Sequence, residues 1–150
     1  MERTIDTKIG PLKIKIEEGY LVELSFEQGE QEDKDPLLDQ VEREIQEYLH
    51  GTRKEFSIPI KPKGTEFQKM VWNALLEIPY GQTCSYGEIA EKIGNPKSSR
   101  AVGQANHNNP ISIIIPCHRV IGKSGALTGY GGGLDKKEYL LQLEEKYDGI

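Results

Sequence analysis

The spacing of apolar residues changes near residue 61, and this change constrains the fold more than any other feature. Over residues 4–27 apolar and polar side chains alternate in short runs, with turn signals at Gly10-Pro11 and Glu18-Gly19. That pattern is typical of a small antiparallel meander. From residue 65 onward the apolar residues recur at helical spacing. The sequence predicts an α+β protein, with a small N-terminal α/β domain (antiparallel sheet plus helix) over 1–62 and a mainly helical domain over 63–150.

One helix is expected in the N-terminal domain. Asp35 can cap it, Pro36 suits its first position, and Gly51 lies just past its end. A short strand is expected near Phe56–Ile60. The segment KPKG (61–64) would then link the two domains.

The C-terminal half carries helix-start signals at regular intervals. Thr65 with Gln68, and Ser85 with Glu88, form capping boxes. A further helix is expected to begin at Ser98 or Ser99, and Asp135 is expected to cap a last one with Glu138. The two short helices on either side of Gly94-Asn95-Pro96-Lys97 make a helix-turn-helix pattern, which also occurs in many domains that never meet DNA.

Composition excludes several classes of protein. Two cysteines are too few for a disulfide framework, no Cys/His cluster has metal-ligand spacing, and no apolar run spans a bilayer. We therefore expect neither a bound metal nor a membrane contact. The N-terminus lacks the apolar h-region of a secretory signal, so a cytoplasmic protein is expected. The net charge of −5 is uneven: residues 1–60 hold eight Lys/Arg and fifteen Asp/Glu, whereas 61–125 hold eight and four. The middle segment is therefore compatible with DNA.

Cys117 and His118 are the candidate nucleophile and base. They follow the apolar segment ISIII and Pro116, which predicts a buried strand or extended segment. Neighbouring side chains of an extended chain point to opposite faces, so His118 would act through a water or need a bend in the chain. A thiolate, not a thiol, is the nucleophile, and a nearby histidine can generate it. The alternative is that Cys117 is an inert core residue.

A wider set of motifs decides between these interpretations. The segment IPCHRV (115–120) occurs together with FQKMVWNALLEIPYG (67–81), SYGEIA (85–90), GNPKSSRAVG (94–103), Asn109-Pro110 and SGALTGYGGGLDKKEYLLQLE (124–144). Their order and spacing resemble those of the O6-alkylguanine-DNA alkyltransferases over residues 65–147. Residues 1–60 fit that family's variable N-terminal domain only loosely.

The resemblance implies a stoichiometric DNA repair reaction without a cofactor. Cys117 would take the alkyl group from O6-alkylguanine, and from O4-alkylthymine as well, and would be inactivated by doing so. His118 would draw off the thiol proton through water, and Glu144 would hold His118. Zinc occurs in the N-terminal domain of some relatives, but residues 1–60 contain no cysteine, so none is expected. Cys84 does not match the acceptor motif and is expected to be a packed residue.

The resemblance also implies how DNA is bound. A monomer would dock its helix-turn-helix in the minor groove of double-stranded DNA and flip the alkylated base outward. Arg100 would fill the vacated place in the stack, Tyr86 would help rotate the nucleotide, and Ala101 and Gly103 would allow close approach to the backbone. Asn109 would order the turn beneath the site. The pocket would be lined by Val120, Ser124, Tyr130 and Gly131, with Ser112 affecting its width.

Two other functions fit parts of the sequence. A cysteine hydrolase would use Cys117 and His118 but would turn over. A DNA-binding regulator would read base sequence and would be indifferent to Cys117→Ala. Neither function explains why motifs far apart in the chain match one family in their order and spacing.

Overall fold

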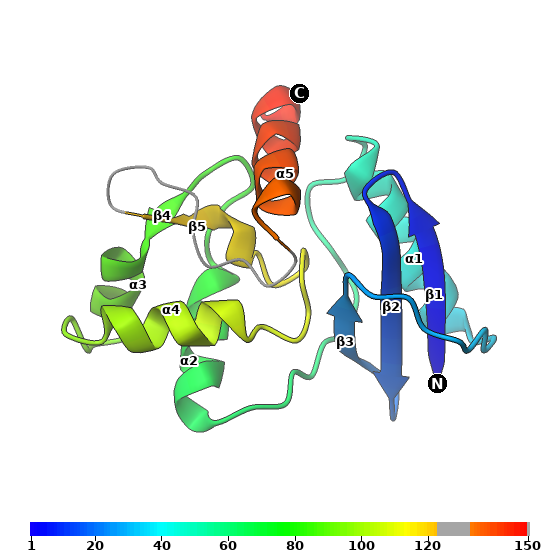
Figure 1. Ribbon diagram of the computed structural model, residues 1–150, viewed down its shortest axis with the longest axis horizontal. Coiled ribbons are helices and arrows are strands. Elements are labelled where there is room, and N and C mark those ends of the chain that lie inside the picture. Colours follow the sequence, from blue (N-terminus) through cyan, green and yellow to red (C-terminus); the bar gives the residue numbers. More distant parts are fainter. Residues whose placement is uncertain (123–132, 150) are drawn as a thin grey trace. The chain divides into compact units, whose positions relative to one another are not determined.

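The computed structural model describes residues 1–122 and 133–149. The chain divides into two compact units, Met1–Lys63 and Gly64–Ile150, and each has its own buried apolar core. None of the helices in the described ranges has the length and apolarity needed to cross a membrane. The α+β fold class is confirmed (Figure 1).

The first unit is built on a three-stranded antiparallel sheet in the order β1-β2-β3 (Figure 1). Its strands are β1 (Glu2–Thr7), β2 (Gly10–Glu17) and β3 (Tyr20–Ser25). Ile5 pairs with Leu12 and Ile14 with Leu24, and all four side chains are buried. The predicted meander is confirmed, and its alternation places one row of apolar side chains on the core face.

Helix α1 (Pro36–Leu49) packs against β1 and β2. The Asp35 side chain accepts a hydrogen bond from Leu37 N at 2.8 Å, as expected for an N-cap. Gly51 follows the helix with φ +81°, a backbone conformation that favours glycine. The helix buries an apolar stripe against the sheet: Leu38, Val41, Ile45, Tyr48 and Leu49.

The strand expected over 56–60 is wrong. The segment pairs with β3 through one isolated parallel bridge, between Leu21 and Ile60. Leu21 N donates to Pro59 O and Lys61 N donates to Leu21 O, both at 2.9 Å. Pro59 has no N–H with which to continue a ladder, so the pairing stays local.

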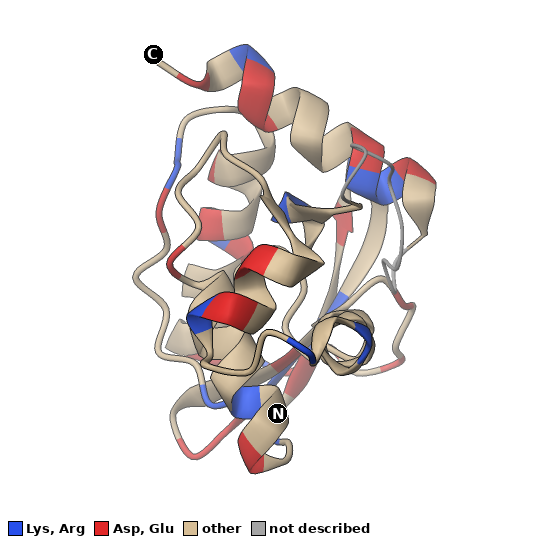
Figure 2. Ribbon diagram, turned by 90° about the vertical axis from the view of Figure 1, so that its left-hand side faces the viewer, with Lys and Arg blue, Asp and Glu red and all other residues tan. Residues whose placement is uncertain are grey.

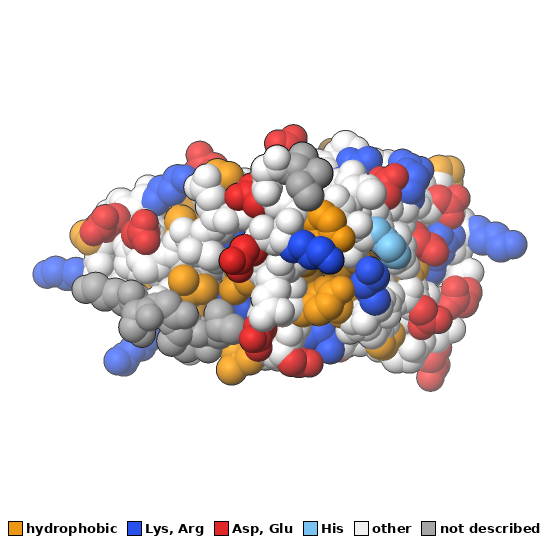
Figure 3. Space-filling model, turned by 90° about the horizontal axis from the view of Figure 1, so that it is seen from above, with side chains coloured by type: hydrophobic (Ala, Val, Ile, Leu, Met, Phe, Trp, Pro, Cys, Tyr) orange, Lys and Arg blue, Asp and Glu red, His pale blue; other side chains and the backbone are white. Residues whose placement is uncertain are grey.

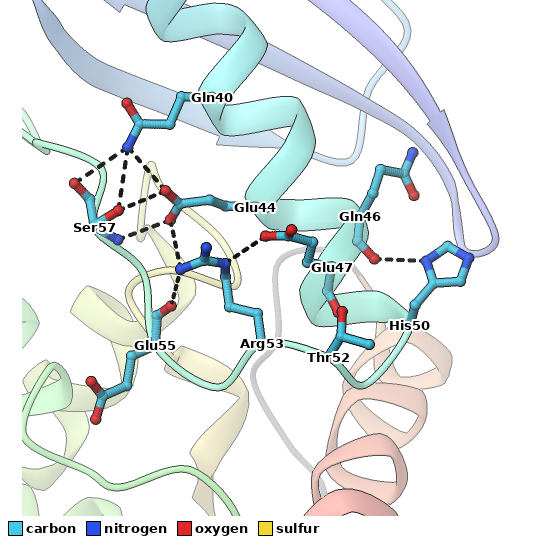
Figure 4. Close-up of polar contacts among 9 residues, drawn as sticks. All are labelled: Gln40, Glu44, Gln46, Glu47, His50, Thr52, Arg53, Glu55 and Ser57. Atoms are coloured by element: carbon cyan, nitrogen blue, oxygen red, sulfur yellow. Dashed lines mark hydrogen bonds and ion pairs between the residues drawn. The ribbon is translucent and has the colours of Figure 1, made fainter.

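A buried carboxylate fastens the segment after α1 (Figure 4). Glu44, 1% exposed, accepts hydrogen bonds from Ser57 N at 2.9 Å, Ser57 Oγ at 2.7 Å and Gln40 Nε2 at 2.9 Å. Arg53 Nη1 lies 3.5 Å from the same carboxylate. These bonds hold the chain against the helix where no strand forms.

The second unit contains three packed helices, α2 (Glu66–Leu75), α3 (Tyr86–Lys92) and α4 (Ser99–His107). Both predicted capping boxes are present, at Thr65 and at Ser85. Helix α2 ends at Leu75, and Ile78 is buried in the turn beyond it. The buried Trp72 Nε1 donates to Ala105 O at 2.9 Å and joins α2 to α4.

The rest of the second unit holds the segment with the two candidate catalytic residues. A short parallel pair joins β4 (Cys84–Ser85) to β5 (Val120–Ile121), and a 3₁₀ turn η1 (Cys117–Arg119) directly precedes β5. Helix α5 (Leu134–Tyr147) packs on η1. The expected cap of α5 at Asp135 is wrong: the N-cap is Gly133, and Asp135 lies in the first turn. A carboxylate there still complements the helix dipole.

Candidate active site

The chain before Cys117 is folded into tight turns, so the buried strand or extended segment expected over 111–120 is wrong except at Val120, where β5 begins. Ile114 N donates to Ser112 O at 2.8 Å, Ile115 N to Ile111 O at 3.1 Å, and Cys117 N to Ile115 O at 2.7 Å. Ile113 has φ +72°, a rare conformation for a β-branched residue. Local turns use the backbone groups that a strand would need. The alternation argument for Cys117 and His118 therefore does not apply, and the two residues lie in a 3₁₀ turn.

Asn109 holds these turns together beneath the thiol. Its Nδ2 donates to Ile115 O at 2.8 Å and to Cys117 Sγ at 3.1 Å, and its Oδ1 accepts from Ile111 N at 3.0 Å. The fully buried Asn106 adds a bond of 3.3 Å from Nδ2 to Cys117 O. The backbone and the sulfur of Cys117 are thus both fixed, and the thiol is 2% exposed.

His118 and Glu144 form a buried pair. His118 Nε2 lies 2.6 Å from Glu144 Oε2, and the side chains are 0% and 1% exposed. An ionised carboxylate only accepts hydrogen bonds, so Nε2 carries the proton and Nδ1 is the basic nitrogen of the neutral ring. This fixes which atom of His118 takes up a proton.

Three shifted pKa values follow from burial and from these contacts. Burial raises the pKa of Cys117 to about 11, although the Asn109 hydrogen bond and the Lys137 charge oppose the shift. Burial lowers the pKa of His118, against the opposing effect of Glu144. Burial alone would raise the pKa of Glu144, but the bonds and charges of His118 and Arg119 outweigh it and hold that pKa far below its ordinary value. Glu144 is therefore ionised at neutral pH.

Two buried cations at the site were missed in the sequence. Arg119 Nε and Nη2 donate to the two oxygens of Glu144 at 2.8 and 2.9 Å. Lys137, 0% exposed on α5, donates through Nζ to Val120 O, and burial lowers its pKa to about 8. Arg119 is adjacent to the Cys-His pair, but no local signal marks either residue as buried. The one available signal is spacing, because Lys137 lies seven residues before Glu144 and shares its helical face.

The predicted DNA-contacting residues lie on α3 and α4. Tyr86 is the first residue of α3, and a Cβ added at Gly103 would lie 3.9 Å from its ring. Arg100 and Ala101 are exposed near the start of α4. The helix sequence SRAVGQANH holds no acidic residue, and the α4 ribbon accordingly carries no red in Figure 2.

The pocket prediction is only partly within the described residues. Val120 is fully buried and pairs with Cys84, and Ser112 is 9% exposed. The predicted pocket residues Ser124, Tyr130 and Gly131 lie outside the described residues. Within the ranges 1–122 and 133–149, no group of three or more His, Cys, Asp or Glu side chains is arranged to hold a metal ion.

Charge is divided unequally between the units. Residues 1–63 contain ten Lys/Arg and fifteen Asp/Glu, whereas residues 64–150 contain nine of each. On the face shown in Figure 3, basic and acidic side chains are interspersed. Binding of the second unit to a polyanion would therefore depend on local groups such as Arg100 and the α4 N-terminus.

Family models match both units. The model described as 6-O-methylguanine DNA methyltransferase, DNA binding domain, matches residues 66–146, and that of the same family's ribonuclease-like domain matches residues 1–62.

Curated relatives are similar over nearly the whole chain. A methylated-DNA–protein-cysteine methyltransferase of Methanosarcina acetivorans is 50% identical over 147 residues, covering 93% of this chain and 94% of the relative. One of Mycobacterium tuberculosis is 48% identical over 150 residues, covering 95% and 91%.

Solved structures agree with these matches. The crystal structure of Mycobacterium tuberculosis O6-methylguanine methyltransferase has a TM-score of 0.90 at 47% identity, covering 99% of this chain and 94% of that one. A structure of the M. tuberculosis protein in complex with DNA also has a TM-score of 0.90, at 49% identity, covering 97% and 93%.

Proposed function

This chain belongs to the 6-O-methylguanine DNA methyltransferase family and so is a methyltransferase of DNA alkylation repair; we propose that Cys117 is its alkyl acceptor. The observation that carries the proposal is the fixed thiol beside a base and its carboxylate. Asn109 lies 3.1 Å from Sγ, and the next residue, His118, lies 2.6 Å from Glu144. Cys84, the other cysteine, has no such surroundings among the described contacts.

The proposed reaction is an in-line displacement. The Cys117 sulfur attacks the alkyl carbon on guanine O6, a C–S bond forms, and the C–O bond breaks with its electron pair staying on O6. The thiol proton leaves through His118 Nδ1, by way of a water, and the guanine that is released takes up one proton. Because the pKa of Cys117 is raised to about 11, the thiol needs this base at the moment of attack.

The product is a thioether, and each molecule reacts once. A thioether has no good leaving group, and nothing in the proposed chemistry returns the sulfur to a thiol. The chain would therefore act as a stoichiometric reagent that is inactivated by the repair it performs. No metal or cofactor enters any step.

The alkylated base must leave the stack before it meets a buried thiol. Extruding a base costs a few kcal/mol, and side chains of α3 and α4 would offset this cost. In the proposal, α4 docks in the minor groove, Arg100 occupies the place of the extruded base, and Tyr86 turns the nucleotide. Readout in that groove is degenerate, which suits a monomer that searches any sequence. O4-alkylthymine is a second proposed substrate.

Mass spectrometry tests the proposal directly. The protein is mixed with a duplex containing one O6-methylguanine, and with an undamaged duplex as control. We expect one added methyl group on the Cys117 peptide, saturating at one per molecule, with guanine restored. Cys84→Ala should behave as the wild type, and Cys117→Ala should bind the duplex without reacting. An unmodified Cys117 after long incubation, in protein that binds the damaged duplex, would contradict the proposal.

A further inference from the structure

The Glu144 carboxylate accepts hydrogen bonds from two buried side chains of the second unit, His118 and Arg119. Glu144 Oε2 accepts from His118 Nε2 at 2.6 Å and from Arg119 Nη2 at 2.9 Å. Its Oε1 accepts from Arg119 Nε at 2.8 Å and from Gly81 N at 3.1 Å. Arg119 thus makes the bidentate contact that fixes the plane of the carboxylate, whereas His118 makes a single bond to it.

Arg119 is itself held by the turn that follows α2. Its Nη1 donates to Ile78 O at 2.7 Å, and its guanidinium lies 5.7 Å from the centre of the Tyr80 ring. Both groups belong to the turn that follows α2, as does Gly81. Gly81 of this turn and Arg119 therefore constrain the orientation of Glu144 in addition to the bond from His118.

The contact between Arg119 and Glu144 also determines the electrostatic surroundings of the His118 ring. Glu144 and Arg119 together are neutral, so the ring faces an ion pair and not a bare carboxylate. Among residues 1–122 and 133–149, the other charged or titratable groups around the ring are Lys137 on α5 and Cys117 on the same turn. Tyr80 faces Glu144 and Arg119 from the turn after α2. Arg119 and Lys137 both disfavour a proton on the ring, and Glu144 favours one.

We infer that Arg119 is a positioning residue: by sharing Glu144 with His118 it fixes the direction of the ring and keeps the resting ring neutral. Only the step it assists, proton uptake from Cys117, depends on the proposed function. The charge state of His118 in the free protein is a property of the structure alone. Arg119 would otherwise be a purely structural ion pair that stabilises the packing of α5 on η1.

Ring titration by ¹⁵N NMR in the free protein separates these two roles. His50→Gln and His107→Gln identify the His118 signals among the three histidines. In Arg119→Met, Glu144 is left without its neutralising partner, so the His118 midpoint should move to higher pH. Arg119→Lys keeps the charge and should titrate like the wild type. The double variant Arg119→Met/Glu144→Gln removes both charges and should reverse the shift. Arg43→Met, at an exposed site on α1, is the control for loss of an arginine.

Reaction rates give a second readout. Misplacement of the ring in Arg119→Met should slow transfer from O6-methylguanine by about 100-fold, and Arg119→Lys should recover part of that loss. If Arg119→Met does not fold, Arg119→Gln carries the same comparison.

A folded variant without the charge whose His118 midpoint equals that of the wild type would overturn the inference. A wild-type protein that transfers no alkyl group would instead overturn the proposed function, and the titration result would still stand.

Discussion

Asn109 and Cys117 are joined by a hydrogen bond from Nδ2 to Sγ of 3.1 Å. The same amide also closes the turn between them, through Ile111 N and Ile115 O. One side chain thus lowers the energy of the thiolate and fixes the path of the backbone that delivers it. These two contributions can be separated by substitution.

Asn109→Asp keeps the acceptor oxygen for Ile111 but replaces the donor with a negative charge. The pKa of Cys117 should rise further, because a like charge disfavours the thiolate. We expect alkyl transfer to slow by about tenfold or more, with a smaller effect of Asn109→Ser. Iodoacetamide labelling of Cys117 as a function of pH measures this. Equal labelling rates in Asn109→Asp and the wild type would show that the hydrogen bond does not act on the thiolate.

The buried Lys137 predicts a pH dependence of stability. Its pKa is about 8 in the folded protein and 10.5 ordinarily, so above pH 8 the unfolded chain binds more protons and the free energy of unfolding rises with pH. The Cys117 thiol, with a pKa raised from 9.0 to about 11, gives the opposite slope above pH 9. Urea denaturation should therefore show a rise of roughly 1 kcal/mol between pH 8 and 9.

Lys137→Met should abolish that rise, whereas the exposed Lys146→Met should keep it. The variant should also slow alkyl transfer, since the Lys137 charge favours the Cys117 thiolate. A rise that persists in Lys137→Met would assign the pH dependence to another group.

The buried Glu44 should make the stability of the first unit sensitive to acid (Figure 4). Burial would raise its pKa, but bonds from Ser57, Gln40 and Arg53 lower it on balance. A depressed pKa contributes stability above the ordinary pKa of 4.5 that is lost as pH falls through the folded value. Glu44→Gln should lower the free energy of unfolding by about 1–3 kcal/mol at pH 7. The more exposed Glu47→Gln should cost less than about 1 kcal/mol. Equal losses of unfolding free energy in the two variants would refute this role of Glu44.

Local sequence signals predicted where helices begin. The turn before Cys117 and the buried cations of the site could not be predicted in this way. Both capping boxes and the Asp35 cap depend on residues within three positions, so the sequence contains the whole interaction. The turn at Ile113 does not: a β-branched residue at φ +72° is held by Asn109, and residue propensity alone favours a strand there. The burial of Arg119 and Lys137 likewise depends on partners at least 17 residues away.

Replacing Gly103 by alanine should stabilise the second unit and weaken its binding to DNA. A Cβ there would meet Tyr86 at 3.9 Å, an ordinary contact, so Gly103→Ala should be accommodated. Alanine is favoured over glycine inside a helix by about 1 kcal/mol, and thermal unfolding should show α4 and the second unit stabilised. If Gly103 allows close approach to DNA, the same variant should bind a damaged duplex more weakly. Unchanged binding would remove Gly103 from the interface.

Substitution of Arg100 should slow alkyl transfer only when the substrate is duplex DNA. Arg100 is exposed on α4, and the hydrogen bonds that hold Cys117 and His118 come from Asn106, Asn109 and Glu144. Arg100→Ala should therefore leave stability and iodoacetamide labelling of Cys117 unchanged. Transfer from O6-methylguanine in a duplex should slow by about 10- to 100-fold, because the cost of extruding the base is no longer offset. Transfer from the free O6-methylguanine base should proceed at the wild-type rate. Lys69→Ala, an exposed cation on α2, is the matched control for charge. If Arg100→Ala slows both substrates equally, Arg100 acts on the thiol and not on the DNA.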